Sequence, residues 1–495
     1  MNALSADRLT AVAHPLRRAT LVGSLLLLLC ACTSVPPQDS TLLPFAVPDA
    51  WSAAGATESP VTNANSSLAE WWLRFDDPLL GRLVVEALAA NSSVRSAQAA
   101  LRQARALRDV AAAALWPTVG SVALAQRSKS GGNAAVNNFR AGFDASWELD
   151  IFGANRSALD ASDATVQASA ASLGDVQVSI AAEVALDYIT LRGAQAQLAI
   201  AADNLDSQLA TLQISQWRLQ AGLTGWLESE QALSLAEQTR ARLPALRSGV
   251  EQLAHALAVL TGQPPATLAS VLATPSAVPQ PANDLVLSIP AETLRQRPDV
   301  RAAEYQVTAA AARVAQADAA LLPNFQLGGS LGLSALTLGA LGSGSSVVSV
   351  LLASVSLPVF EGGALRAQVR AQQAALDAAR SAYEATVLAA LKDVEDALVA
   401  LRANRERLTY LQRAAAAAGN AALLARQRYA SGLIDFQTVL DTQRTQLAAQ
   451  DSVASTGTLL AADHVRLYKA LGGGWRAADQ DAPPALLADT PRSTQ

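Results

Sequence analysis

Cysteine is almost absent from this chain of 495 residues, and its two copies, Cys30 and Cys32, lie close together near the N-terminus. The rest of the chain therefore has no second cysteine for an internal disulfide, and its stability must come from packing. The hydrophobic content of 51% is ample for that purpose. The formal net charge is only −5, so no basic surface indicates binding to nucleic acid.

Long apolar runs are also lacking beyond the N-terminal region. A transmembrane helix needs about 20 mostly apolar residues, and no later stretch meets that need. A membrane protein without such a helix must be attached by lipid, form a β-barrel, or both.

Histidine is scarce as well, with three copies in the chain. His14 lies in the N-terminal region, and His255 and His464 lie in expected helices without metal-ligand spacing. No nucleophile elbow, phosphate loop or zinc motif is found, and the acidic cluster at Asp393, Glu395 and Asp396 fits a solvated helix face. We therefore expect no enzyme, no catalytic residue, no metal and no cofactor.

The N-terminus has the pattern of a secretory signal, with a basic start before the uncharged apolar stretch from Thr20 to Leu29. The segment Leu29-Cys30-Ala31-Cys32 resembles the bacterial lipobox, which implies lipidation of Cys32. Cys30 fits less well because the bulky Leu29 precedes it. Thr33, rather than an aspartate, follows Cys32, which by the same resemblance favours the outer membrane. The alternative is an ordinary cleaved signal peptide.

An internal duplication dominates the remaining sequence. The segment from Asn91 to Pro117 corresponds to the segment from Arg297 to Pro323 at a constant offset of 206 (297 − 91). Further matches keep the same order: Leu149 to Phe152 with Leu357 to Phe360, Arg218 to Leu223 with Arg428 to Leu433, and Gly262 with Gly472. Agreement of proline, glycine and phenylalanine in order makes chance similarity between alanine-rich helices a poor explanation.

Each repeat predicts a helix of about 26 residues, a strand pair, a helix of about 66 residues and a return helix of about 41 residues. Two coiled-coil seams are expected along the long helices, one through Leu159, Val166, Leu173 and Ile180, the other from Leu391 to Leu408. The expected segments are a signal peptide (1–31), a lipid-tethered segment (32–67), a first repeat (68–262) with strands at 118–127 and 139–150, a Pro-rich linker (263–291), a second repeat (292–474) with strands at 323–334 and 346–358, and a disordered tail (475–495).

The strands alternate apolar and polar residues, as from Phe139 to Leu149. Period-two alternation over about 10 residues is typical of outer-membrane strands, although one face of a soluble sandwich gives the same pattern. Four strands per chain are too few to close a barrel, whereas three chains supply twelve. We therefore expect a mainly α chain with a transmembrane β portion, in which a symmetric trimer forms a twelve-strand β-barrel and the helices continue it as a second, helical barrel.

Four segments carry a family resemblance: Trp71 to Leu80, Trp147 to Gly153, Arg297 to Arg301, and Val439 to Asp441. They resemble TolC-type outer-membrane efflux proteins, and within these the NodT-like lipoprotein branch that serves resistance-nodulation-division pumps. The resemblance spans roughly Leu68 to Gly474. It implies a homotrimer in which a twelve-strand β-barrel continues into a twelve-helix periplasmic α-barrel. By the same resemblance, this trimer is a passive duct for small molecules such as drugs, working with a periplasmic adaptor and an inner-membrane pump.

The resemblance also places the periplasmic tip at two turns, Gly222-Leu223 and Gly432-Leu433. Asp441 matches a position where relatives ring the pore with acidic side chains, whereas Thr438 replaces a second aspartate. Asp441 is otherwise a solvated helix charge or a partner of Arg444. Two other functions stay open, a duct for protein (type I) secretion and a lipid-tethered periplasmic coiled coil.

Overall fold

The computed structural model describes residues 45–52, 68–281 and 290–476, and the following concerns the unit that begins at Val47. The expected signal peptide, Cys32 and much of the expected tether lie outside the described residues.

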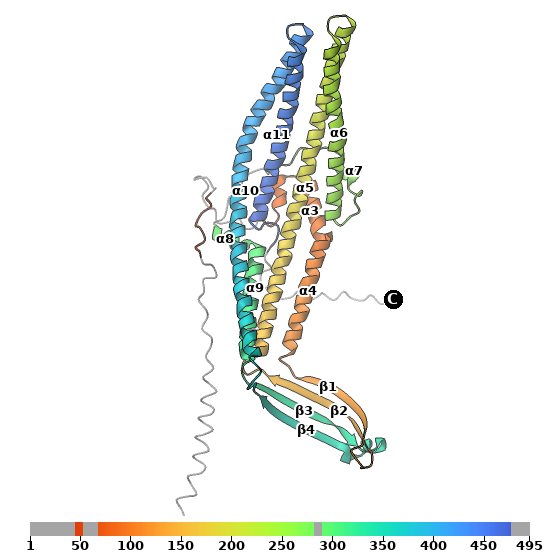
Figure 1. Cartoon of the computed structure of the whole chain (residues 1–495), viewed down its shortest axis with the longest axis vertical. Helices are drawn as coiled ribbons and strands as arrows, with labels where there is room; N and C mark the ends of the chain where they lie inside the picture. Colours follow the sequence, from red (N-terminus) through yellow and green to blue (C-terminus); the bar gives the residue numbers. More distant parts are fainter. Residues whose placement is uncertain (1–44, 53–67, 282–289, 477–495) are drawn as a thin grey trace, which may run out of the picture. The chain divides into compact units, whose positions relative to one another are not determined.

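The fold repeats one plan twice (Figure 1). The first copy contains α4 (Ser92–Ala113), β1 (Thr118–Ser128), β2 (Val136–Leu149), α5 (Ala154–Gln220) and α6 (Trp226–Leu260). The second contains α9 (Pro298–Ala319), β3 (Asn324–Ala335), β4 (Val347–Ser356), α10 (Ala364–Ala430) and α11 (Phe436–Ala470). Matching helices have equal lengths of 22, 67 and 35 residues. The expected mainly α fold with two strand pairs is confirmed.

Smaller elements precede the first copy, join the two copies, or lie between β3 and β4. They are η1 (Trp71–Phe75), α3 (Pro78–Ala90), α7 (Ala269–Leu272), α8 (Pro290–Gln296), η2 (Leu338–Gly342) and η3 (Gly344–Ser346). Asp77 caps α3, because its Oδ1 accepts hydrogen bonds from the backbone N–H groups of Leu79 and Leu80 at 2.9 and 3.1 Å. Within the described ranges, no helix combines the length and the apolar character needed to cross a bilayer.

The two long helices, α5 and α10, run the length of the helical part, and the shorter helices pack beside them in pairs (Figure 1). Asn91, at the start of α4, donates from Nδ2 to the Leu260 carbonyl at the end of α6 at 2.9 Å. Arg297, at the start of α9, donates from Nη1 to the Ala470 carbonyl at the end of α11 at 2.9 Å. The short helices therefore meet end to end, as their summed lengths predict.

The four strands form one antiparallel sheet in the order β1-β2-β3-β4. The register places Trp147 opposite Leu327, and Phe143 opposite Leu331, so that these side chains share an apolar face. The other face pairs Asp144 with Ser330 and Glu148 with Gln326. β4 departs from the alternation, because its polar-face positions include Val348, Val350 and Leu352.

The main core lies where η1 and α3 pack against the middle of α5 and the end of α11. Trp71 is fully buried and stacks on Tyr468 with ring centroids 5.3 Å apart. The aromatic residues of η1 therefore serve packing.

The expected leucine seam on α5 is only partly right. Ile180 is buried, but Leu159, Val166 and Leu173 are only half-buried. The buried line consists instead of small residues: Ala161, Ala164, Ala168, Ala171 and Gly174. α5 packs against α4 and α9 at once, and small side chains permit helix axes to come close on both sides.

Trp475, expected in the disordered tail, is packed into the fold. Its indole nitrogen donates to the Gln296 carbonyl at 3.1 Å, and the Arg301 guanidinium lies 5.7 Å from a Trp475 ring centroid. Packing of the large apolar ring in this contact is more favourable in free energy than its exposure to solvent.

Candidate functional site

Two matching turns end the long helices at the end remote from the sheet (Figure 1). Gly222 and Gly432 have φ angles of +69° and +73°, a region that L side chains adopt only with strain. The next backbone N–H, of Leu223 or Leu433, donates to the carbonyl of Arg218 or Arg428 at 2.8 and 2.9 Å. Glycine in this hydrogen-bonded arrangement stops an α-helix and reverses the chain.

The turns present apolar side chains to solvent. Leu223 is 69% exposed and Leu433 is 73% exposed, and Trp226 beside the first turn is 73% exposed. Exposed apolar groups of this size at the end of a helical hairpin are suited to contact with another protein.

A cluster around Tyr429 links the two helical hairpins just behind these turns. The Tyr429 hydroxyl donates to Glu228 Oε2 at 2.6 Å, which joins α10 to α6. Arg218 of α5 donates from Nη1 to the Tyr429 carbonyl at 2.8 Å and lies 4.6 Å from the ring centroid. Burial, and next the bond to Glu228, raise the pKa of Tyr429 to about 12.

Tyr429 belongs to no local sequence motif that would predict its role. The signal in the sequence that points to Tyr429 is its place in the repeat, because Tyr429 corresponds to Leu219 of the first copy. A polar aromatic group at a position where the other copy has leucine indicates a specific hydrogen bond.

Further polar contacts join α5 to α11 along the same half of the helices. Gln443 Nε2 donates to Thr211 Oγ1 at 2.8 Å in a buried position, and Asn204 Nδ2 donates to Gln450 Oε1 at 2.7 Å. Buried polar pairs fix how two helices sit against each other, because any shift leaves both groups without partners. The two hairpins are thus held in one defined arrangement.

Asp441 lies on the exposed side of α11, in the second turn of the helix. Its Oδ1 accepts from Gln437 Nε2 at 3.0 Å and lies 3.4 Å from Arg444 Nη1. Asp441 also borders a hollow of about 260 Å³, which Thr438, Thr442 and Thr445 help to line. Within one chain, its charge is therefore paired on its own helix.

Thr438 does not supply a second acidic group. Its hydroxyl donates to Asp435 Oδ1 at 2.5 Å, and the same oxygen accepts from the Thr438 backbone N–H at 2.9 Å. These bonds cap α11 and lower the pKa of Asp435. The structure brings Thr438 and Asp441 to one hollow but does not bring either turn glycine into it.

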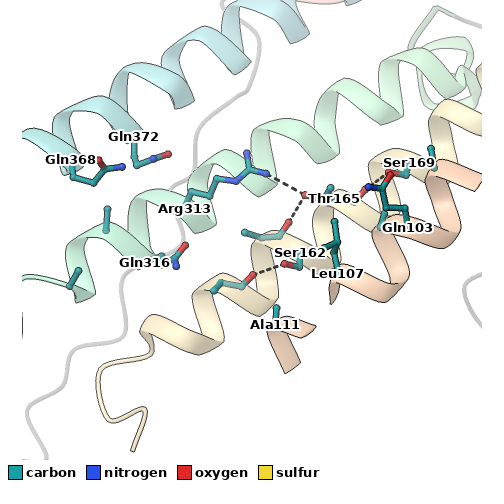
Figure 2. Close-up of a pocket in the computed structure, with 16 residues that line it drawn as sticks. Gln103, Leu107, Ala111, Ser162, Thr165, Ser169, Arg313, Gln316, Gln368 and Gln372 are labelled. Carbon is teal, nitrogen blue, oxygen red and sulfur yellow. Dashed lines mark hydrogen bonds between the residues drawn. The ribbon is translucent and has the colours of Figure 1, made fainter. Parts of the chain in front are cut away.

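A larger cavity of about 770 Å³ lies among α4, α5, α9 and α10, in the half of the helices nearer the sheet (Figure 2). Figure 2 shows Arg313 reaching from α9 toward Thr165 of α5, with a distance of 3.5 Å from Nη2 to Oγ1. Gln103, Gln316, Gln368 and Gln372 also line this space.

No cluster of three metal-ligating side chains occurs among the described residues. His464 is buried beside Tyr468, with ring centroids 6.4 Å apart, and His255 is exposed. Each histidine therefore occupies a separate packing or surface position.

A family model described as "Outer membrane efflux protein" matches residues 83–263 and 289–473, which together take in both copies of the repeat. The chain belongs to the outer membrane efflux protein family.

Relatives and solved structures agree with this membership. Outer membrane protein OprJ of Pseudomonas aeruginosa is 31% identical over 457 residues, covering 91% of this chain and 94% of OprJ. Nodulation protein T of Rhizobium leguminosarum bv. viciae is 29% identical over 472 residues, covering 95% and 96% of the two chains. The structure of the outer-membrane channel OprN matches with a TM-score of 0.80 and 36% identity, covering 87% of this chain and 99% of OprN.

These findings confirm the TolC-like family, the fit to its NodT-type branch, and the outer membrane as the location. This efflux family member is therefore an outer-membrane efflux channel protein. The tip turns, Asp441 and Cys32 remain predictions about individual residues.

Proposed function

We propose that three copies of this chain form a passive duct through which a tripartite efflux system exports small molecules across the outer membrane. The main support for this proposal is the sheet, which has an apolar face. Its two edge strands, β1 and β4, are each paired on one side only within the described chain. An open sheet edge requires a partner in a membrane, because unpaired backbone groups are costly there. Three copies supply twelve strands and satisfy every edge, with β4 of one copy beside β1 of the next.

The family works together with a periplasmic adaptor and an inner-membrane pump. We infer that the adaptor contacts the exposed apolar turns at Leu223 and Leu433, and that the pump supplies the energy and selects the solute. The chain itself then carries out no catalytic step.

The assembly is tested with one cysteine in each edge strand. Val122 of β1 and Val348 of β4 occupy the same face, because the register connects them through Gly142 and Gly332. In the double variant Val122→Cys with Val348→Cys, bifunctional maleimides of increasing spacer length should give covalent trimers, because barrel closure staggers the two edge strands along their axes. Each single variant is the control, because identical positions of a threefold ring lie far apart.

The same protein should conduct ions in planar bilayers and have the mass of a trimer. A monomeric protein that conducts under no opening condition and gives no crosslinked trimer contradicts the duct.

We infer that the mature protein is anchored by acyl chains on Cys32, on the basis of the lipobox resemblance. A single acyl chain binds a membrane only marginally at about 0.8 kcal/mol per buried CH₂, so several chains make the durable anchor. Cys32→Ser should abolish labelling by a radioactive fatty acid, whereas Cys30→Ser should retain it. Labelling of Cys32→Ser would overturn the assignment.

A further inference from the structure

We propose that Arg313 lies on the channel wall and makes the part of the duct nearest the sheet favour anionic solutes. This inference rests on the proposed trimeric duct and adds a residue that sets its charge preference.

The helix arrangement decides which face is turned inward. α4 packs against α5, α5 against α9, and α9 against α10, so that the four helices form one layer. The cavity of about 770 Å³ is lined by side chains from all four. Side chains from helices that are separate in the layer reach this one space (Figure 2), from which we infer that it lies on the concave side of the layer. In a ring built from three such layers, the concave side faces the axis.

The lining of this concave side is neutral apart from Arg313. The other polar residues are amides and hydroxyls, and the rest are alanines and Leu107. The hydroxyls of Ser162, Thr165 and Ser169 donate to carbonyls of their own helix at 2.7 to 2.9 Å. No aspartate or glutamate is among the lining residues.

The Arg313 charge is not cancelled within the described part of the chain. Its guanidinium contacts the neutral Thr165 hydroxyl at 3.5 Å, and no ion pair of Arg313 is found there. Arg108 on the neighbouring α4 differs, because it pairs with Asp163 at 2.9 Å and does not line the cavity. An arginine stays protonated at any physiological pH, so three copies place three permanent cations around the axis.

A cysteine beside Arg313 reports the local potential directly. Gln316 lies one turn along α9 and lines the same cavity, and Gln316→Cys gives a labelling site there. We compare its labelling rates with anionic and cationic methanethiosulfonates of similar size, and unsubstituted protein gives the background rate. A unit charge about 6 Å away in a water-like dielectric changes each rate about threefold in opposite directions. Arg313→Gln should therefore lower the anion-to-cation rate ratio about tenfold.

Two control variants and one measurement in planar bilayers complete the test of Arg313. Arg313→Lys should keep the ratio, and Arg105→Gln should leave it unchanged, because the exposed Arg105 is on α4 outside the cavity. In planar bilayers under a KCl gradient, Arg313→Gln should shift the reversal potential toward cation preference. An unchanged ratio and an unchanged reversal potential in a conducting trimer overturn the Arg313 assignment alone. A wild-type protein that forms no conducting trimer overturns the duct and this inference together.

Discussion

At the scale of single residues, the tip and the concave wall carry opposite charges. Asp441 near the start of α11 is acidic, and Arg313 near the end of α9 is basic. The two groups differ in their partners, because Asp441 has Arg444 at 3.4 Å whereas Arg313 has a neutral hydroxyl. Screening over about 8 Å at physiological salt keeps their fields local, so in the proposed duct each charge would act only on its own part of the channel.

Asp441→Ala should lower the preference for cations if three copies of Asp441 surround the entrance. The expected change is up to about threefold, the effect of a unit charge a few ångströms from a passing ion in a water-like dielectric. The measurement is the reversal potential in a bilayer under a salt gradient.

Arg444→Ala is the matched control for Asp441, because it removes the cation that pairs with that carboxylate. The reversal potential should then move in the opposite direction, toward stronger cation preference. If neither substitution moves the potential, Asp441 is a surface charge only.

Alkaline pH should open the tip through Tyr429. The folded-state pKa of about 12 exceeds the ordinary value of 10.0, so deprotonation is opposed by the fold. The stabilisation that the Tyr429–Glu228 hydrogen bond gives to the fold is fully present below pH 10. It is lost as the pH rises through about 12, because the deprotonated Tyr429 and Glu228 would then be two anions facing each other. The open probability of single channels should rise in that window.

Tyr429→Phe removes the same bond at neutral pH. A hydrogen bond contributes about 1 kcal/mol net, so the open-to-closed ratio should rise about fivefold and lose its alkaline transition. Tyr410→Phe is the control, because Tyr410 lies on the same helix but is 60% exposed. Equal open probabilities for all three proteins contradict a link at Tyr429.

At the scale of elements, Arg297 joins the start of α9 to the end of α11 in the second repeat. Its guanidinium lies at the C-terminal end of α11 and also pairs with Asp299 at 2.6 Å and with Asp393 at 3.3 Å. A cation at a helix C-terminus is favourable, and its removal here leaves the partly buried carboxylate of Asp299 without its cation.

Arg297→Ala should destabilise the fold by about 3 kcal/mol, the scale expected for removing one member of a partly buried ion pair. The midpoint of thermal unfolding should fall clearly. Arg295→Ala, two residues away and exposed, should leave the midpoint within error. Equal midpoints for the two variants would show that Arg297 does not hold the junction.

The elements themselves follow closely from local sequence signals. Proline and glycine punctuation fixes the helix ends, and each strand begins and ends within three residues of its expected position. The packing seam of α5 was harder to predict, because alanine is a weak hydrophobic signal and its burial depends on two neighbouring helices. The Tyr429–Glu228 bond joins positions 201 residues apart, and no local pattern connects them.

At the scale of the whole molecule, the sheet of one chain has two edge strands, β1 and β4, that are each paired on one side only within the described residues. Large apolar side chains on both edge strands remain exposed, among them Val119 of β1 and Leu351 and Val355 of β4. The sequence indicates the number of strands per chain, whereas their neighbours in the assembly depend on residues of other copies. Orientation of the sheet is therefore the property that most directly distinguishes a membrane duct from a soluble sandwich.

Two adjacent leucines of β4 test that orientation. Leu351 shares a face with Gly329, Ala145 and Val119, whereas Leu352 faces the opposite side with Gly328 and Ser146. Both are well exposed in a single chain, at 79% and 59%. Leu351→Arg should strongly reduce the amount of folded trimer in the outer membrane, because an arginine facing lipid costs about 2–4 kcal/mol at the midplane. Leu352→Arg should assemble nearly normally, because in the proposed barrel this face of the sheet lines the water-filled interior. Equal assembly of the two variants, measured as trimer on an unheated gel, would show that the apolar face of this sheet does not meet lipid.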